Sequence, residues 1–164
     1  MGTRWKIISI GTAAPVLLIG VLWFANYATS VESGPLTEPA KTVLEKYEGI
    51  QETLAGDSTI GISEGAAAIA KTIRDDAGKS FPLTVADAAD QLAQAQDIKD
   101  ARRAFKPLSA SLIAWLEESK LESTGYQEAY CPMADASWLQ KEEEIRNPYL
   151  GKKMLNSGEF DRSF

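Results

Sequence analysis

The chain contains no histidine and a single cysteine, Cys131, among its 164 residues. Without imidazole, it lacks the side chain that most often acts as general base or pH switch near neutral pH. It also lacks a glycine-rich phosphate loop and a Gly-x-Ser-x-Gly nucleophile motif. A lone cysteine cannot form an internal disulfide, and as a nucleophile it would need a base other than histidine. These absences argue against an enzyme, and we expect no catalytic site.

Positive charge is also scarce. The formal net charge is −6, and it becomes −8 without Arg4 and Lys6, because no acidic residue precedes Glu32. Nucleic-acid phosphates and anionic lipid headgroups both favour a basic protein surface. We therefore expect no nucleic-acid partner.

Residues 7–25 form the one long apolar run, and Arg4 and Lys6 precede it. About 20 apolar residues span a bilayer as a helix, and flanking cations tend to stay on the cytoplasmic side. We therefore predict that residues 1–29 are a membrane anchor or signal segment and that the rest of the chain is exported. The alternative to an uncleaved anchor is a signal peptide cleaved near Ala28-Thr29-Ser30, which would leave an exported and soluble domain.

The middle of the chain has the pattern of a helical bundle. Residues 30–39 contain Gly34, Pro35 and Pro39 and indicate a short tether. Between residues 40 and 122, apolar residues recur at helical spacing in four segments, 40–54, 62–77, 85–95 and 98–116. Residues 56–59 are polar and predict the cap of the second helix. Pro107 predicts a kink or a helix restart in the fourth segment.

The composition changes at Ser123, where Gly, Pro, Tyr, Trp and Asn become frequent. We predict that residues 123–164 pack on the bundle as an irregular C-terminal segment. They would contain one short helix over residues 136–146, with Trp138 and Ile145 on one face, ended by Asn147-Pro148. The expected fold class is all-α, an antiparallel three- to four-helix bundle with an irregular C-terminal cap, preceded by one N-terminal transmembrane helix.

The sulfur-bearing side chains, apart from Met1, all lie in this C-terminal segment: Cys131, Met133 and Met154. Thiolate and thioether are soft donors that favour Cu(I) or Ag(I). In an extended Cys-Pro-Met segment, residues 131 and 133 would point to the same side, and Met154 could complete a three-sulfur metal site. The alternative is that all three residues fill gaps in the core, as Met and free Cys commonly do.

Several motifs here resemble those of a known family. They are Ala-Arg-Arg-Ala-Phe-Lys-Pro-Leu-Ser-Ala-Ser-Leu (101–112), Tyr-Cys-Pro-Met-Ala (130–134), Trp138 and Ile-Arg-Asn-Pro-Tyr-Leu-Gly-Lys-Lys-Met-Leu (145–155). The stretch from residue 36 to 158 resembles a small bacterial domain that occurs alone or appended to periplasmic adaptor subunits of copper/silver-type heavy-metal efflux systems. The resemblance implies a periplasmic domain with an efflux adaptor or other envelope protein as partner, and the apolar run over residues 7–25 predicts single-pass attachment to the bacterial inner membrane.

The sequence departs from the family pattern at two positions. Ser157 stands where the family usually has a second cysteine, and Tyr130 stands where a histidine often precedes the first cysteine. Both departures remove potential ligands, so Cys131, Met133 and Met154 are the donors that match. Two hypotheses follow: a membrane-anchored accessory module that binds Cu(I) or Ag(I), and a metal-free helical protein-interaction or scaffold domain of the cell envelope.

Overall fold

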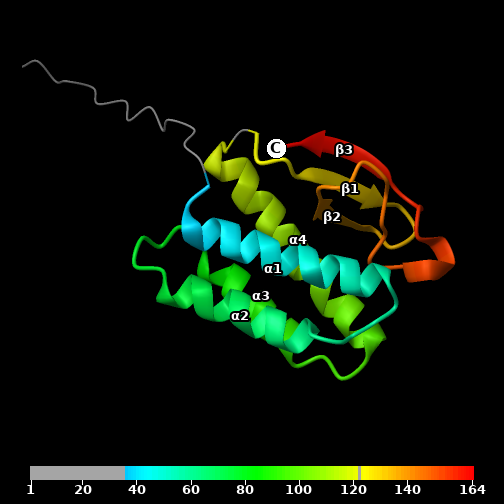
Figure 1. Ribbon diagram of the computed structural model, residues 1–164, viewed down its shortest axis with the longest axis horizontal. Coiled ribbons are helices and arrows are strands. Elements are labelled where there is room, and N and C mark those ends of the chain that lie inside the picture. Colours follow the sequence, from blue (N-terminus) through cyan, green and yellow to red (C-terminus); the bar gives the residue numbers. More distant parts are fainter. Residues whose placement is uncertain (1–35, 122) are drawn as a thin grey trace, which may run out of the picture. The chain divides into compact units, whose positions relative to one another are not determined.

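A computed structural model describes residues 36–121 and 123–164 (Figure 1). The predicted membrane segment and most of the predicted tether lie outside the described residues. Among the residues that are described, no helix combines the length and the apolar character needed to cross a bilayer.

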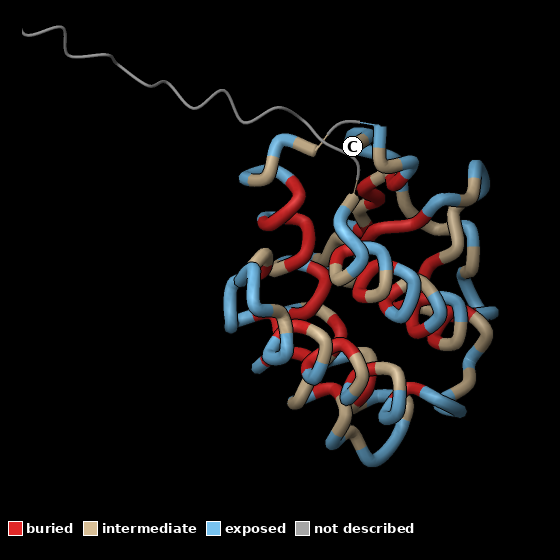
Figure 2. Tube along the Cα trace, turned by 60° about the vertical axis from the view of Figure 1, so that its left-hand side comes forward, coloured by how far each residue is buried: buried red, intermediate tan, exposed pale blue. Residues whose placement is uncertain are grey.

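The four predicted helical segments are all helices, and their apolar stripes form the core (Figure 2). The elements are α1 (Glu38–Ala55), α2 (Ile62–Asp75), α3 (Leu83–Ala93) and α4 (Ile98–Ser119). Helix α1 starts where Thr37 accepts a hydrogen bond from the Ala40 amide at 3.4 Å, and α4 starts where Asp97 accepts one from the Asp100 amide at 2.8 Å. Helix α4 continues through Pro107, so the predicted restart does not occur.

The all-α prediction is wrong, because the C-terminal segment contains a three-stranded antiparallel sheet. Its strands are β1 (Gln127–Cys131), β2 (Ala136–Gln140) and β3 (Glu159–Ser163), and their order in the sheet is β2-β1-β3. Ala129 pairs with Trp138 in the β1–β2 hairpin, and Tyr130 pairs with Glu159 of β3. A short 3₁₀ helix, η1 (Gly151–Met154), precedes β3.

The predicted helix over residues 136–146 is therefore wrong as well. Its first five residues form β2, in which Trp138, Leu139 and Gln140 are all fully buried. A strand that is covered on only one face shows alternating apolar and polar residues. Three consecutive residues of β2 are buried, so this alternation is missing from the sequence. The seven-residue spacing of Trp138 and Ile145 was therefore interpreted as one face of a helix.

The elements form three layers in an α+β arrangement. Helices α2 and α3 pack on each other, with α1 against α2 and α4 against α3. Helices α4 and α1 also contact β2, so these two helices lie between the other helices and the sheet (Figure 1). This arrangement places the start of α4 beside the C-terminal segment that carries the predicted site residues.

Candidate functional site

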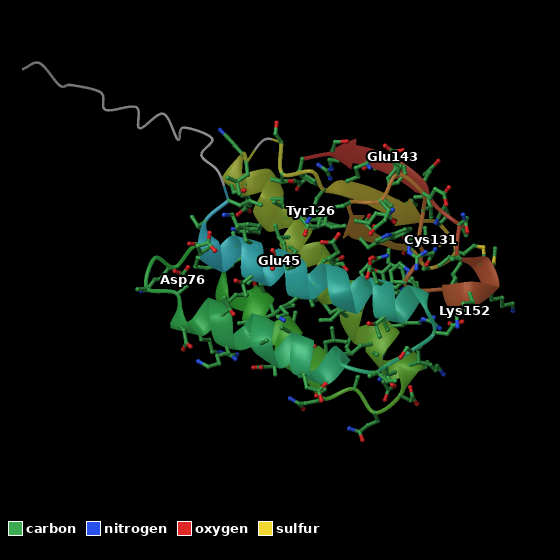
Figure 3. The ribbon with its side chains drawn as sticks, viewed as in Figure 1. Glu45, Asp76, Tyr126, Cys131, Glu143 and Lys152 are labelled. Carbon is green, nitrogen blue, oxygen red and sulfur yellow. The ribbon has the colours of Figure 1, made fainter. Side chains whose placement is uncertain are left out.

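The three predicted sulfur ligands lie in different surroundings. Cys131 lies at the end of β1 (Figure 3) and is fully buried, whereas Met133 is 63% exposed and Met154 is 37% exposed. The strand ends at Cys131, and a turn starts at Pro132, where the Asp135 amide donates to the Pro132 carbonyl at 3.3 Å. The i, i+2 geometry expected for an extended Cys-Pro-Met segment is therefore lost. Cys131 lies in the core, and Met133 reaches solvent.

The surroundings of the three sulfurs bear on the predicted metal site. Among the described residues, no group of three or more Cys, Asp or Glu side chains is placed to hold a metal ion. Met133 lines a surface groove to which neither Cys131 nor Met154 contributes. Of the three predicted ligands, the structure thus gives Met133 and Met154 access to solvent and leaves Cys131 among apolar side chains.

Asn147 organises the turn that follows β2. Its side-chain oxygen accepts hydrogen bonds from the Tyr149 amide at 2.8 Å and the Leu150 amide at 3.0 Å, and its side-chain nitrogen donates to the Ser157 carbonyl at 2.6 Å. The Asn147 backbone amide donates to the Leu155 carbonyl at 2.7 Å. Asn147 is fully buried, so these hydrogen bonds replace the ones that its side-chain and backbone amide groups would otherwise make to water.

Gln140 likewise fixes the loop that runs from the end of β2 to Asn147. Its side-chain nitrogen donates to the carbonyls of Glu142 at 2.9 Å and Glu144 at 2.8 Å. Its oxygen accepts from the Trp138 indole at 2.9 Å and the Arg146 amide at 3.1 Å. The four hydrogen bonds use every donor and acceptor position of the buried amide.

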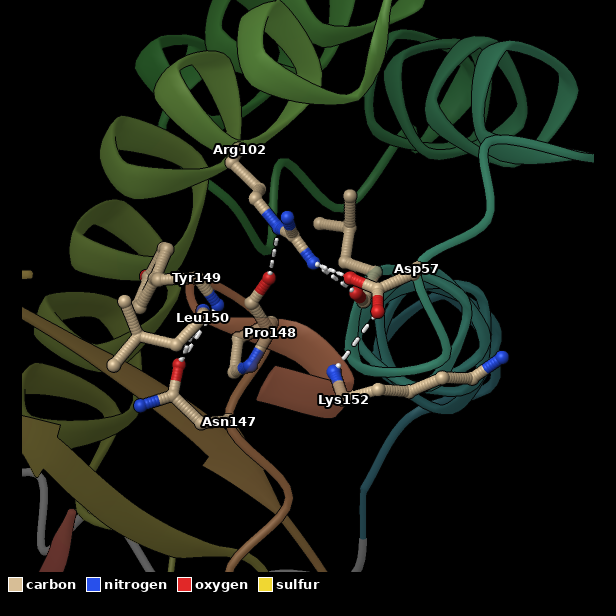
Figure 4. A network of polar contacts seen from close by, with 8 residues as sticks. Asp57, Arg102, Asn147, Pro148, Tyr149, Leu150 and Lys152 are labelled. Atoms are coloured by element: carbon tan, nitrogen blue, oxygen red, sulfur yellow. Dashed lines mark hydrogen bonds and ion pairs between the residues drawn. The ribbon is translucent and has the colours of Figure 1, made fainter. Parts of the chain in front are cut away.

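Arg102 connects this segment to the helices (Figure 4). Its Nε donates to the Pro148 carbonyl at 2.8 Å, and one Nη donates to the Leu54 carbonyl at 2.8 Å and pairs with Asp57 at 2.6 Å. The other Asp57 oxygen accepts from the Lys152 amide at 3.0 Å, at the start of η1. The hydrogen bond from Arg102 lowers the pKa of Asp57, and the bond from the Lys152 amide acts in the same direction.

Gly151 is required at the centre of this junction. Its φ is +60°, and a Cβ at this position would overlap Asp57 and the Arg102 guanidinium. Residues 56–59 were predicted to cap α2, but α2 starts after Gly61 without a side-chain cap, and Asp57 binds Arg102 and the Lys152 amide instead. Sequence reasoning did not identify Arg102 or this role of Asp57.

Two tyrosines form hydrogen bonds to the backbone of β2, which is an edge strand of the sheet. The Leu139 amide donates to the Tyr47 hydroxyl at 3.0 Å, and the Tyr47 hydroxyl also bonds the Ser109 hydroxyl at 2.7 Å. The Tyr149 hydroxyl donates to the Ser137 carbonyl at 2.6 Å. Burial raises the pKa of both Tyr47 and Tyr149, so both side chains stay neutral. Their hydroxyl groups satisfy backbone groups of β2.

A groove of about 450 Å³ lies between the first half of α4 and the two turns of the C-terminal segment. One wall carries four cationic side chains, Lys99, Arg102, Arg103 and Lys106. These positions follow i, i+3, i+4 and i+7 spacing, which places them on one face of the helix. That spacing is the sequence signal that could have revealed the groove. Four cations on one helix face stand out in a chain with a net charge of −6.

The rest of the groove is mainly apolar. Met133 and Ala134 come from the turn after β1, Tyr149 and Leu150 come from the turn after Asn147, and Ile98 comes from α4. The Lys106 ammonium lies 5.8 Å from the centre of the Tyr149 ring and donates to the Ala134 carbonyl. Apolar surface beside convergent polar groups is typical of binding sites. We call this surface, with its four cations and its apolar residues, the α4 groove.

Comparison with known proteins gives no relative for this chain. No family model matches it, and neither a curated protein nor a solved structure matches it. The resemblance to efflux-associated domains therefore stays a prediction, and the candidate site depends on the residues and geometry described above.

Proposed function

We propose that residues 36–164 form a non-catalytic protein-interaction domain that docks a partner protein in the α4 groove. The proposal depends on one observation: Met133 is 63% exposed and lines the same groove as the cationic face of α4. Exposed apolar surface costs solubility, and a methionine can adapt its shape to a partner. This proposal develops the scaffold hypothesis, with an α+β domain in place of a helical one.

The rigid surroundings of the groove support a docking role. Arg102 is fixed by Leu54, Asp57 and Pro148, and Tyr149 is 7% exposed and hydrogen-bonded to Ser137. A surface that is already ordered loses little conformational entropy when a partner binds. The hydrogen bonds around Asn147 and Arg102 thus prepare the groove for binding.

Site-specific photo-crosslinking in cells tests the docking proposal. A photo-reactive amino acid would replace Met133 in one full-length variant and Leu83 in another. Leu83 lies on α3 and is 64% exposed, which matches the 63% of Met133 and makes it a control for exposure. We expect a discrete partner adduct at position 133 that is absent at position 83. Equal adduct yields at the two positions, or no adduct at position 133, would refute docking in the groove.

The partner is proposed to be an envelope protein. The apolar run over residues 7–25 supports export, and the motif resemblance supports an efflux adaptor as one candidate. Mass spectrometry of the adduct at position 133 identifies the protein. A partner confined to the cytoplasm would contradict the periplasmic location.

Binding of Cu(I) or Ag(I) is the second candidate function, because Met133 and Met154 reach solvent. Two features weigh against a three-sulfur site at Met133. Cys131 is fully buried, and the cations of the α4 groove repel a metal cation. Titration of the purified protein with Cu(I) against a competing chelator, repeated with Cys131→Ser and Met133→Leu, tests this function. Tight uptake that both variants lose would support it, and equal, weak uptake by all three proteins would exclude it.

A further inference from the structure

We propose that the α4 groove binds an extended acidic peptide segment in which carboxylates alternate with apolar side chains. This inference rests on the proposed docking function and names the chemistry of the occupant. Its basis is the combination of a cationic wall and an apolar floor in one groove of an otherwise acidic chain.

The charges on the groove wall are not all needed by the fold. Lys99 has no ion-pair partner among the described residues and lies in the first turn of α4, where the helix macrodipole disfavours a cation. The side chain of Arg103 is 71% exposed, and its one ion pair within the described part of the chain is with Asp100 of the same helix. Both cations can therefore turn to a bound carboxylate without disturbing the junction at Arg102.

The spacing of the cations fits an extended peptide. Lys99 and Arg103 are four residues apart, as are Arg102 and Lys106, which corresponds to about 6 Å along a helix axis. Alternate residues of an extended chain are about 6.6 Å apart and point to the same side. Carboxylates at positions i and i+2 of the peptide can thus each reach a cation of α4.

The apolar residues of the groove can bind the peptide side chain that lies between the two carboxylates. In an extended peptide this side chain points away from the cationic wall. Met133 and Leu150, from the two turns that line the groove with α4, offer apolar contact to this side chain. A segment of the pattern Glu-Leu-Glu therefore matches both sides of the groove, whereas a basic peptide would meet four like charges.

Peptide binding to the purified full-length chain in a non-ionic detergent tests this inference. Three labelled peptides are compared by fluorescence anisotropy: Glu-Leu-Glu-Leu-Glu, the charge-reversed Lys-Leu-Lys-Leu-Lys and the less apolar Glu-Ser-Glu-Ser-Glu. We expect the first peptide to bind most tightly and its affinity to fall as salt rises. Lys99→Gln and Arg103→Gln should each weaken it about three- to five-fold through lost charge complementarity. Lys79→Gln, which removes an exposed lysine outside the groove, should not change it.

Several outcomes would overturn the inference. Equal binding of the acidic and basic peptides, or an affinity that does not depend on salt, would exclude an acidic occupant. Binding of phosphatidylglycerol vesicles that Lys99→Gln abolishes, without peptide binding, would assign the groove to lipid. Self-association that Lys99→Gln abolishes would assign it to a second copy of the chain.

The two levels of the proposal can fail separately. A partner adduct at position 133 together with no binding of acidic peptides would leave docking in place and reject the acidic occupant. No adduct at position 133 would reject the docking function itself.

Discussion

The helices and the C-terminal segment are held together by different interactions. Between the helices, contact is mainly apolar, as where the rings of Tyr47 and Phe105 stack at 5.0 Å. In the C-terminal segment, the buried amides of Gln140 and Asn147 and the guanidinium of Arg102 bind backbone groups. An apolar contact tolerates another side chain of similar volume, whereas a buried hydrogen bond requires a particular donor or acceptor.

This difference has a consequence for the candidate site. The α4 groove lies where the two parts meet, with one wall from a helix and the other from the hydrogen-bonded turns. Substitutions in the apolar core should therefore lower global stability. Substitutions of the polar junction residues should also change the shape of the groove.

The largest effect is expected from Phe105→Ala, because Phe105 is fully buried and also lies 5.9 Å from the Tyr149 ring. Truncating a buried phenylalanine typically lowers the free energy of unfolding by about 3–5 kcal/mol. Urea unfolding followed by circular dichroism measures the change. Phe160→Ala is the control, since Phe160 is 37% exposed and should cost far less. Equal losses for the two variants would contradict a core centred on Phe105.

Asn147→Ala should lower the unfolding free energy by about 3 kcal/mol, because it removes three side-chain hydrogen bonds and leaves buried groups unpaired. The exposed Asn156 provides the control variant, Asn156→Ala. Hydrogen exchange adds a local readout. The amides of Tyr149 and Leu150 should lose protection more than amides in α2, and uniform loss along the chain would contradict a local role for Asn147.

Tyr47→Phe should cost about 1–2 kcal/mol, because the ring stays packed while the hydroxyl partner of Ser109 and of the Leu139 amide is lost. Chemical denaturation measures the change, with Tyr130→Phe as the comparison. The Tyr130 hydroxyl donates a hydrogen bond to Asp135 at an exposed site. A Tyr130→Phe variant that is less stable than Tyr47→Phe would show that the edge of β2 does not depend on Tyr47.

The smallest effect concerns the pH dependence of the Arg102–Asp57 ion pair. Because the pKa of Asp57 is lower in the folded than in the unfolded chain, the pair stabilises the fold above the unfolded-state pKa. That contribution is lost as the pH falls through the folded-state pKa. Asp57→Asn should therefore lower the unfolding free energy at pH 7, and its difference from the unaltered chain should shrink as the pH falls below the unfolded-state pKa of Asp57. A difference that does not shrink as the pH falls would contradict this linkage, and Asp75→Asn controls for a surface carboxylate.

The helical part of the fold could be predicted from the sequence because each helix buries one face. The stripe that includes Leu44, Tyr47 and Leu54 is buried as predicted, as is the stripe that includes Phe105 and Leu112. Periodicity is sufficient to locate the helices, although α2 lacks the cap predicted at residues 56–59 and α4 continues through Pro107.

The sheet and the site could not be predicted, because they depend on contacts between residues far apart in the sequence. Trp138 and Leu139 show no alternation, since both faces of β2 are covered. Cys131 and Met133 were expected on one side of an extended segment, but the turn at Pro132 separates them. The Asp57–Arg102 pair joins residues 45 positions apart, and no local pattern marks such a partner.

The yield of partner adduct at position 133, relative to position 83, tests the central claim most directly. The two side chains are equally exposed, so exposure alone predicts a ratio near one. Docking in the α4 groove predicts a strong adduct at position 133, and an acidic occupant predicts that this adduct weakens when Lys99→Gln and Arg103→Gln are added to the same chain. A ratio near one would contradict docking in the groove, and an adduct that is unaffected by the loss of both cations would contradict the acidic occupant alone.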